Sequence, residues 1–264
     1  MSRFGTQSQE SDEVLEAFRR FLPARQAPER EILVVNWEGP EQVRRLLEEA
    51  FGSLPVELEE RNRPEIGENL VVLVDEGEVV ATSSLESLQQ AVLLVNVDLY
   101  RTGLSGIDKY EAPDVLTAID ERLFSLRGFP ASTKEKLLLV VILRFIEKRA
   151  LEAGEGRLDV AFQELSRMDD EYGTEKVYQR LADSDLEVHV YGVPDTTPEV
   201  DGITVHAGRA ERYRRSWFVV FQPPPGEEPA ALLAVETGPN EWDSMWTYDC
   251  GRVDRLGDII ETGF

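Results

Sequence analysis

The chain has 264 residues and a formal net charge of −23, from 28 basic and 51 acidic side chains. This imbalance excludes broad binding to nucleic acid, because contact with a phosphate backbone needs a basic surface. The single cysteine, Cys250, excludes an intramolecular disulfide framework and sites built from paired cysteines. The longest apolar run, Leu137–Leu143, is far shorter than the roughly 20 residues of a membrane span, and residues 1–12 are too polar for a signal sequence. We therefore expect a soluble, cytoplasmic, globular protein that contacts neither membrane nor nucleic acid.

The basic residues divide unevenly into 5 lysines and 23 arginines. Arginine is less strongly hydrated than lysine and pairs bidentately with carboxylates. An acidic, lysine-poor surface is typical of a cytoplasm with molar salt, where the Debye length falls to about 3 Å and self-repulsion is screened. The composition predicts a halophilic protein; the alternative is an acidic protein from ordinary salt.

Residues 1–29 are expected to form a flexible lead with one short amphipathic helix. Apolar residues of segment 11–22 fall on one helical stripe, and Pro23 ends it. A small α/β lobe is predicted over residues 30–100. It contains strands at 32–35, 56–58, 70–74 and 79–82 and a helix at 40–50.

Residues 111–184 are predicted to be helical, with helices at 113–123, 133–153, 158–168 and 174–182. The second of these begins with a capping box formed by Ser132 and Glu135. Its apolar side chains surround most of the helix, so we expect it to be central to the fold or buried in a homodimer.

The last third, residues 185–264, reads as a sheet. Strands are predicted at 186–191, 203–206, 217–221, 230–235 and 245–248, followed by a closing helix at 252–260. The fold class is therefore α+β: a C-terminal, mostly antiparallel sheet with packed helices, preceded by a small α/β lobe and a long central helix.

The sequence contains no phosphate-binding glycine loop and no nucleophile elbow, and we predict no catalytic residue and no metal site. Aromatic side chains and both histidines gather in the predicted sheet. Large aromatics beside a few hydrogen-bonding groups are the usual composition of a small-molecule pocket, and the alternative is that they only fill the core. The candidate pocket residues are His189, Tyr191, His206, Trp217, Trp246 and Tyr248.

The most basic stretch of the chain precedes the strand at 217–221. Its arginines, Arg209, Arg212, Arg214 and Arg215, are candidates for contact with an anion or an acidic partner. The alternative is a solvated connection.

Six ordered segments of the C-terminal half carry a resemblance to a known family. They are GRLDVAFQELS (156–166), VHVYGVPD (188–195), VHA (205–207), WFVVF (217–221), ALLA (231–234) and MWTYD (245–249). The series resembles the DICT sensory domain family, which is named for its association with diguanylate cyclases and two-component systems, and in particular its haloarchaeal members. The resemblance covers about residues 30–262.

The resemblance implies a signal-input domain of α+β fold, usually joined to cyclase, phosphodiesterase or kinase output modules, for which a role in light response has been suggested. It supplies no binding residue, and the cofactor is unknown. Because 264 residues leave no room for an output module, we expect a non-enzymatic module that binds a small molecule or partner protein and relays a conformational change. Two alternatives remain: a halophilic enzyme of unrecognised class with Tyr191, His189 and His206 near a cleft, and an interaction scaffold that dimerises through the long helix.

The net charge leads to a first prediction. We expect the protein to lose its fold below about a few tenths molar salt, because its self-repulsion is then unscreened. Melting curves recorded from low to molar KCl measure this effect. An unchanged melting temperature would contradict the halophilic interpretation.

Overall fold

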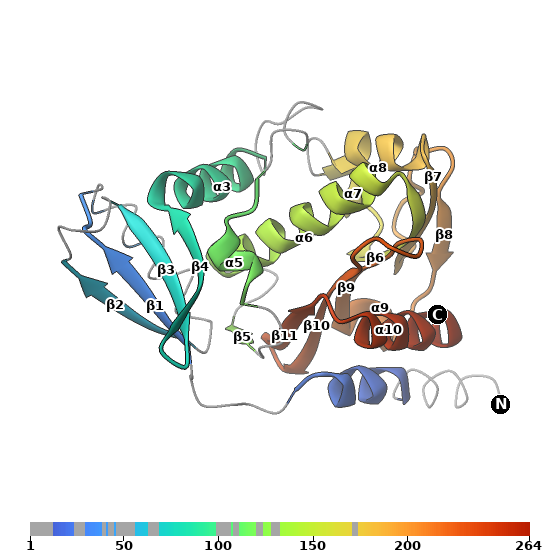
Figure 1. The fold of residues 1–264 in the computed structure, drawn as a ribbon. Coiled ribbons are helices and arrows are strands. Elements are labelled where there is room, and N and C mark those ends of the chain that lie inside the picture. The colour runs from blue at the N-terminus through green and yellow to red at the C-terminus, as the bar shows by residue number, and fades with distance from the viewer. Residues whose placement is uncertain are drawn as a thin grey trace.

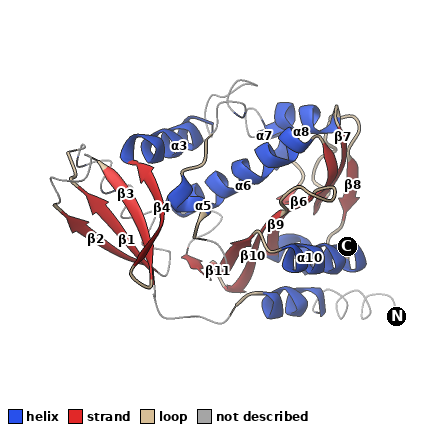
Figure 2. Cartoon of the chain, viewed as in Figure 1, coloured by secondary structure: helices blue, strands red, loops and turns tan. Residues whose placement is uncertain are grey.

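Two β-sheets of different size organise the described part of the chain (Figure 1). The computed structural model describes residues 13–23, 30–38, 41, 45, 56–62, 69–98, 107, 111–119, 124–127, 133–170 and 174–264. The smaller sheet has the strand order β2-β1-β3-β4, and the larger has the order β5-β11-β10-β9-β6-β7-β8. Helices cover both faces of the larger sheet (Figure 2).

The smaller sheet contains β1 (Arg30–Val35), β2 (Val56–Arg61), β3 (Leu70–Asp75) and β4 (Glu78–Ser84), and α3 (Leu85–Asp98) follows it. Strand β1 pairs parallel with β2 and antiparallel with β3, and β3 and β4 form a hairpin. The four strands predicted here are confirmed. Of the helix predicted at 40–50, only residues 41 and 45 are described, and both are helical; the rest lies outside the described residues.

The larger sheet is built from seven strands: β5 (Phe124–Arg127), β6 (Glu155–Glu164), β7 (Asp185–Val193), β8 (Thr204–Ala207), β9 (Ser216–Gln222), β10 (Ala230–Gly238) and β11 (Glu241–Thr247). Strands β6, β7 and β8 are parallel to one another, and every other neighbouring pair is antiparallel. The predicted α+β class with a mostly antiparallel C-terminal sheet is confirmed. Strands β9 and β10, which are apolar on both faces, are central as expected.

The helix predicted at 158–168 is wrong, because most of this segment is the central strand β6. Leu158, Ala161, Phe162 and Leu165 repeat at helical spacing, which produced the wrong assignment. The middle of β6 is buried on both faces, and the strand pairs with β7 along one edge and with β9 along the other. Tertiary pairing therefore decides its conformation.

The helix predicted at 113–123 is also too long. The structure has one helical turn, α5 (Asp114–Thr117), and strand β5 begins at Phe124. Ser83 holds this turn, because its Oγ accepts a hydrogen bond from the Val115 amide at 3.0 Å. Arg30 adds a second tie from the smaller sheet by donating from Nη1 to the Ala118 carbonyl at 2.9 Å.

Helix α6 (Thr133–Ala153) crosses one face of the larger sheet together with α7 (Arg167–Asp170) and α8 (Thr174–Ala182). The opposite face is covered by the N-terminal helix (residues 13–21), α9 (Glu211–Arg215) and α10 (Cys250–Gly263). Leu139, Ile142, Ile146 and Ala150 of α6 are fully buried, so this helix is central to the fold, the first of the two predicted alternatives. Among the described helices, none combines the length and the apolarity that crossing a bilayer requires.

The burial of α6 leads to a stability prediction. Ile142→Ala leaves a cavity under the helix and should lower the free energy of unfolding by about 2–5 kcal/mol. The control, Val79→Ala, removes methyl groups from a side chain that is 65% exposed and should cost less than about 1 kcal/mol. Denaturant unfolding in molar KCl measures both; equal losses would contradict the assignment of α6 to the core.

Candidate functional site

The larger sheet separates the six predicted pocket residues. Tyr191 and Trp246 are each 1% exposed, but they belong to hydrophobic clusters on opposite faces. Trp246 and the half-buried Trp217 pack on the face covered by α6, whereas Tyr191 packs on the face covered by α10. The single aromatic wall expected from the sequence is therefore two separate groups.

The first group joins both histidines to Tyr191 at the edge of the sheet. Strand β7 pairs in parallel with β8, and Tyr191 is in register with His206. Their rings stack with centroids 4.4 Å apart at an interplanar angle of 10°. His189 Nδ1 and His206 Nε2 are 2.9 Å apart, which is a hydrogen bond between two imidazoles of which one donates.

A buried carboxylate anchors this group. Asp159 is fully buried in β6, next to His189 in the register of β6 and β7. Its Oδ2 accepts from Arg157 Nε at 2.8 Å, and its Oδ1 accepts from Arg157 Nη2 at 2.9 Å and from the Tyr191 hydroxyl at 2.7 Å. A buried charge is tolerated when it is paired and fully hydrogen-bonded, as here.

The environment shifts the pKa values of Arg157, Tyr191 and both histidines. The hydrogen bond to Asp159 raises the pKa of Arg157, while burial and the Asp159 charge raise the pKa of Tyr191, so both stay protonated. Burial and the positive charge of Arg157 lower the pKa of His189. Burial, followed by the proximity of His189, lowers the pKa of His206. Both imidazoles are consequently neutral at neutral pH, and the network is satisfied within itself.

The four candidate arginines do not converge on one site. Arg209 donates to the Pro194 carbonyl, Arg214 donates to the Arg209 carbonyl at 2.6 Å, and Arg215 binds Glu236 at 2.8 Å. Three of the four side chains are thus engaged with the protein itself.

Arg212 is placed differently. Its guanidinium lies over the Tyr213 and Phe264 rings, at 5.5 and 5.6 Å from their centroids. It also lines a cavity of about 540 Å³ between the N-terminal helix and the end of α10.

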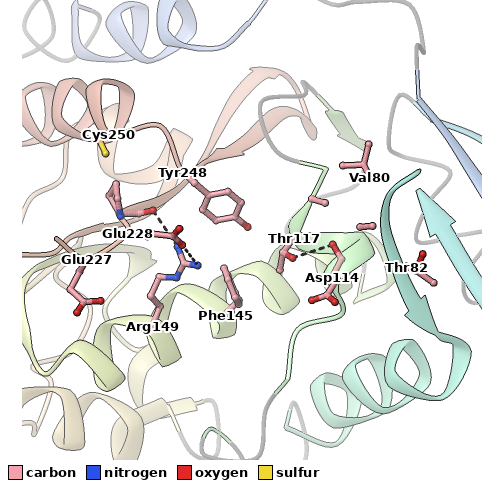
Figure 3. Close-up of a pocket in the computed structure, with 13 residues that line it drawn as sticks. Val80, Thr82, Asp114, Thr117, Phe145, Arg149, Glu227, Glu228, Tyr248 and Cys250 are labelled. Atoms are coloured by element: carbon pink, nitrogen blue, oxygen red, sulfur yellow. Dashed lines mark hydrogen bonds and ion pairs between the residues drawn. The ribbon is translucent and has the colours of Figure 1, made fainter. Parts of the chain in front are cut away.

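A larger cavity, of about 750 Å³, lies where the smaller sheet approaches the larger one (Figure 3). Segments far apart in the sequence line it: β4, α5, α6, the loop between β9 and β10, and the segment after β11. Tyr248 is the predicted pocket residue that it contains. The other lining residues were not predicted. Phe145 and Arg149 belong to the mostly apolar helix α6, and only their spacing of four residues indicates that they share a helix face.

Arg149 is the centre of this cavity wall. Its guanidinium carbon is 4.8 Å from the Phe145 ring centroid and 5.3 Å from that of Tyr248, and the two rings meet nearly edge to face at 80°. Its Nη2 lies 3.1 Å from a carboxylate oxygen of Glu228, and Nη1 donates to the Pro229 carbonyl at 3.5 Å. Aromatic faces attract a guanidinium and hold its plane, so this cation is fixed before any ligand arrives.

Within the described ranges, no group of three or more histidine, cysteine or acidic side chains is arranged to hold a metal ion. The Cys250 thiol, on the rim of the larger cavity, is exposed and forms no disulfide. The arrangement at Arg149 suits the binding of a small molecule, because a fixed cation and an aromatic surface line a cavity that has both polar and apolar walls.

Comparisons with known proteins give one family. Residues 114–237 match the family model described as DICT, "Sensory domain in DIguanylate Cyclases and Two-component system". No curated protein matches the chain. Among solved structures, the chain is similar to a polyphosphate kinase from Porphyromonas gingivalis, with 12% identity and a TM-score of 0.34. The similarity covers 95% of this chain and 47% of the kinase, so the chain spans about half of that protein, and so low a score carries no argument about fold or activity.

The histidine pair leads to a prediction about pH. In the folded protein both pKa values lie below the usual 6.5, so the unfolded chain binds protons that the folded chain does not. The free energy of unfolding should therefore be highest above about pH 7.5 and fall as the pH drops through about 6.5 toward 5.5. Urea unfolding in molar KCl across that window measures the slope.

The matched variant carries His189→Gln and His206→Gln together. Removing both titrating groups should flatten the dependence between about pH 5.5 and 7.5, whatever the change in overall stability. A slope equal to that of the unaltered protein would show that the histidines do not cause it.

Proposed function

Because the chain carries a DICT sensory domain at residues 114–237, we propose that it is a non-enzymatic sensory module whose small-molecule ligand binds in the cavity at Arg149. The location of the cavity carries this proposal. One wall is formed by α6 and the loop before β10, which lie within the matched residues 114–237. Another wall is formed by β4, which lies outside them. A ligand there would touch β4 of the smaller sheet as well as α6 and the connections that border the larger sheet. Its affinity would then differ between arrangements of these parts, which is the requirement for a relayed signal.

Two hydrogen bonds that join the α5 turn to the smaller sheet support this relay. Although α5 lies inside the family segment, Ser83 and Arg30 bind it to the smaller sheet. The cavity therefore lies between the smaller sheet with α5 and the larger sheet with α6, beside the hydrophobic core that the two share. Closing on a ligand would move the first group against the second.

Helix α6 offers a route from the cavity to the far side of the domain. Next to Phe145, Arg144 is buried and binds Glu147 at 2.6 Å, and Glu147 accepts the Tyr178 hydroxyl of α8 at 2.9 Å. A shift of α6 would strain these buried bonds unless α8 follows. We assign the output to a partner protein, with the exposed Arg209 and Arg214 beside β8 as a contact for an acidic partner.

The predicted pocket residues divide accordingly. We assign Tyr248 to the ligand cavity and Trp217 and Trp246 to packing. The enzyme alternative would need Tyr191 and the histidines to face a cleft, but Tyr191 is 1% exposed and donates its hydroxyl to Asp159.

The ligand site is tested by native mass spectrometry. Protein incubated with a small-molecule cell extract in high salt and then exchanged into a molar volatile ammonium salt, which keeps its charges screened, should retain a bound molecule, released on denaturation. Tyr248→Leu should lose it, because the ring that supports Arg149 is gone. His206→Gln, an equally drastic change on the opposite face of the sheet, should keep it. Retention by Tyr248→Leu, or no adduct with the unaltered protein, would contradict the proposed site.

A further inference from the structure

We propose that the cavity recognises a small monocarboxylate with an apolar body, and that Glu228 occupies the position of the ligand's carboxylate until the ligand displaces it. This inference rests on the proposed function, whose cavity it uses, and adds the chemical class of the ligand.

The guanidinium of Arg149 determines the chemical class of the ligand. Arg149 is the only basic residue among the described residues that line the cavity. Its side chain is 26% exposed, so its charge is partly desolvated and acts more strongly than a free surface arginine. The planar fork of guanidinium donors matches the two oxygens of a carboxylate, and the rings of Phe145 and Tyr248 hold that plane in place.

Glu228 already presents a carboxylate to this fork. The contact is a single oxygen 3.1 Å from Nη2, and the Glu228 side chain is 80% exposed. An ion pair with one partner in solvent is screened and contributes little, so a carboxylate with additional contacts replaces it readily. The backbone of the neighbouring Pro229 also accepts from Arg149, which keeps the arginine in position after Glu228 leaves.

The acidic side chains that line the cavity disfavour ligands with more than one negative charge. Asp114, Glu227 and Glu228 all line the cavity, so a polyphosphate or dicarboxylate would bring several negative charges close to acidic side chains. A single negative charge, neutralised by Arg149, avoids this repulsion.

The apolar body of the ligand has a matching surface. Val80 of β4 is 49% exposed and lines the cavity beside Ala81, across from the aromatic pair. An apolar group seated between Val80 and Tyr248 would remove both surfaces from water.

Benzoate serves as the probe, and benzamide, its neutral analogue, as the control ligand. Calorimetric titrations in molar KCl compare the unaltered protein with Glu228→Gln, Glu152→Gln and Arg149→Gln. High salt suppresses general charge effects and leaves the contact with Arg149.

Benzoate should bind Glu228→Gln several-fold more tightly than the unaltered protein, because the internal competitor is gone. Glu152→Gln, which removes an equal charge from α6 one turn from Arg149 but outside the cavity lining, should change the affinity much less. Arg149→Gln should weaken benzoate binding about ten-fold or more, as the loss of a charge-assisted hydrogen bond does. Benzamide should show neither effect.

Equal tightening by both glutamate variants, an Arg149→Gln variant that still binds benzoate, or no binding of benzoate to Glu228→Gln would overturn the inference. If Arg149→Gln does not fold, the comparison of the two glutamate variants decides alone. The mass-spectrometry experiment could show a molecule that the unaltered protein retains and the Tyr248→Leu variant does not. If benzoate nevertheless fails to bind, the carboxylate class is refuted and the proposed function stands.

Discussion

The burial of one face of α6 is the constraint on which the candidate site depends. Leu139, Ile142, Ile146 and Ala150 are fully buried, and they recur at the three- and four-residue spacing of one helical face. That burial fixes the rotation of the helix about its axis. Residues 145 and 149 then lie one residue before buried positions, turned toward the end of the sheet where β4 and α5 approach. The same packing that stabilises the core therefore determines where Arg149 points.

Polar groups buried beside this packing limit how the helix can move. Arg144 and Glu147 lie on α6 between the apolar positions, and their bonds reach Thr174 and Tyr178 of α8. The charge pair itself lies within α6 and moves with the helix. A shift away from α8 would instead break the hydrogen bonds to Thr174 and Tyr178, and losing hydrogen bonds between buried polar groups is costly. Small movements of α6 at the cavity are consequently coupled to α8 rather than absorbed between the two helices. The Asp159 network has the corresponding role in the sheet, where Arg157 and Tyr191 link β6 to β7.

The sequence predicts those parts of the fold whose pattern has a local cause. Strands β9 and β10 were found because they are apolar on both faces, and α6 because a capping box and glycines delimit it. Strand β6 was missed because its apolar residues also fit a helix, and only pairing with β7 and β9 selects the strand. Tyr191 was predicted to line a pocket, yet it is buried in the hydrophobic cluster on the face covered by α10, which no property of β7 itself reveals.

The candidate site was the least predictable part for a related reason. Val80, Arg149, Glu228 and Tyr248 come from segments up to 168 positions apart, and none of them belongs to a motif. Their proximity follows from how two sheets meet, not from a local pattern. Of this group, only Tyr248 was marked in advance, because an aromatic ring with a polar group is informative wherever it lies.

The charge of the protein and the chemistry of the cavity are connected. A molecule of net charge −23 repels an approaching carboxylate over a range set by the salt concentration. In dilute salt that repulsion opposes entry, whereas in molar salt it is confined to about 3 Å. The attraction of Arg149 then acts only within the cavity, where two rings and a carbonyl hold the guanidinium and solvent is partly excluded. Recognition of an anion by this surface is therefore compatible with its acidity under the conditions that also relieve its self-repulsion, and it requires the cation to be enclosed rather than displayed on the surface.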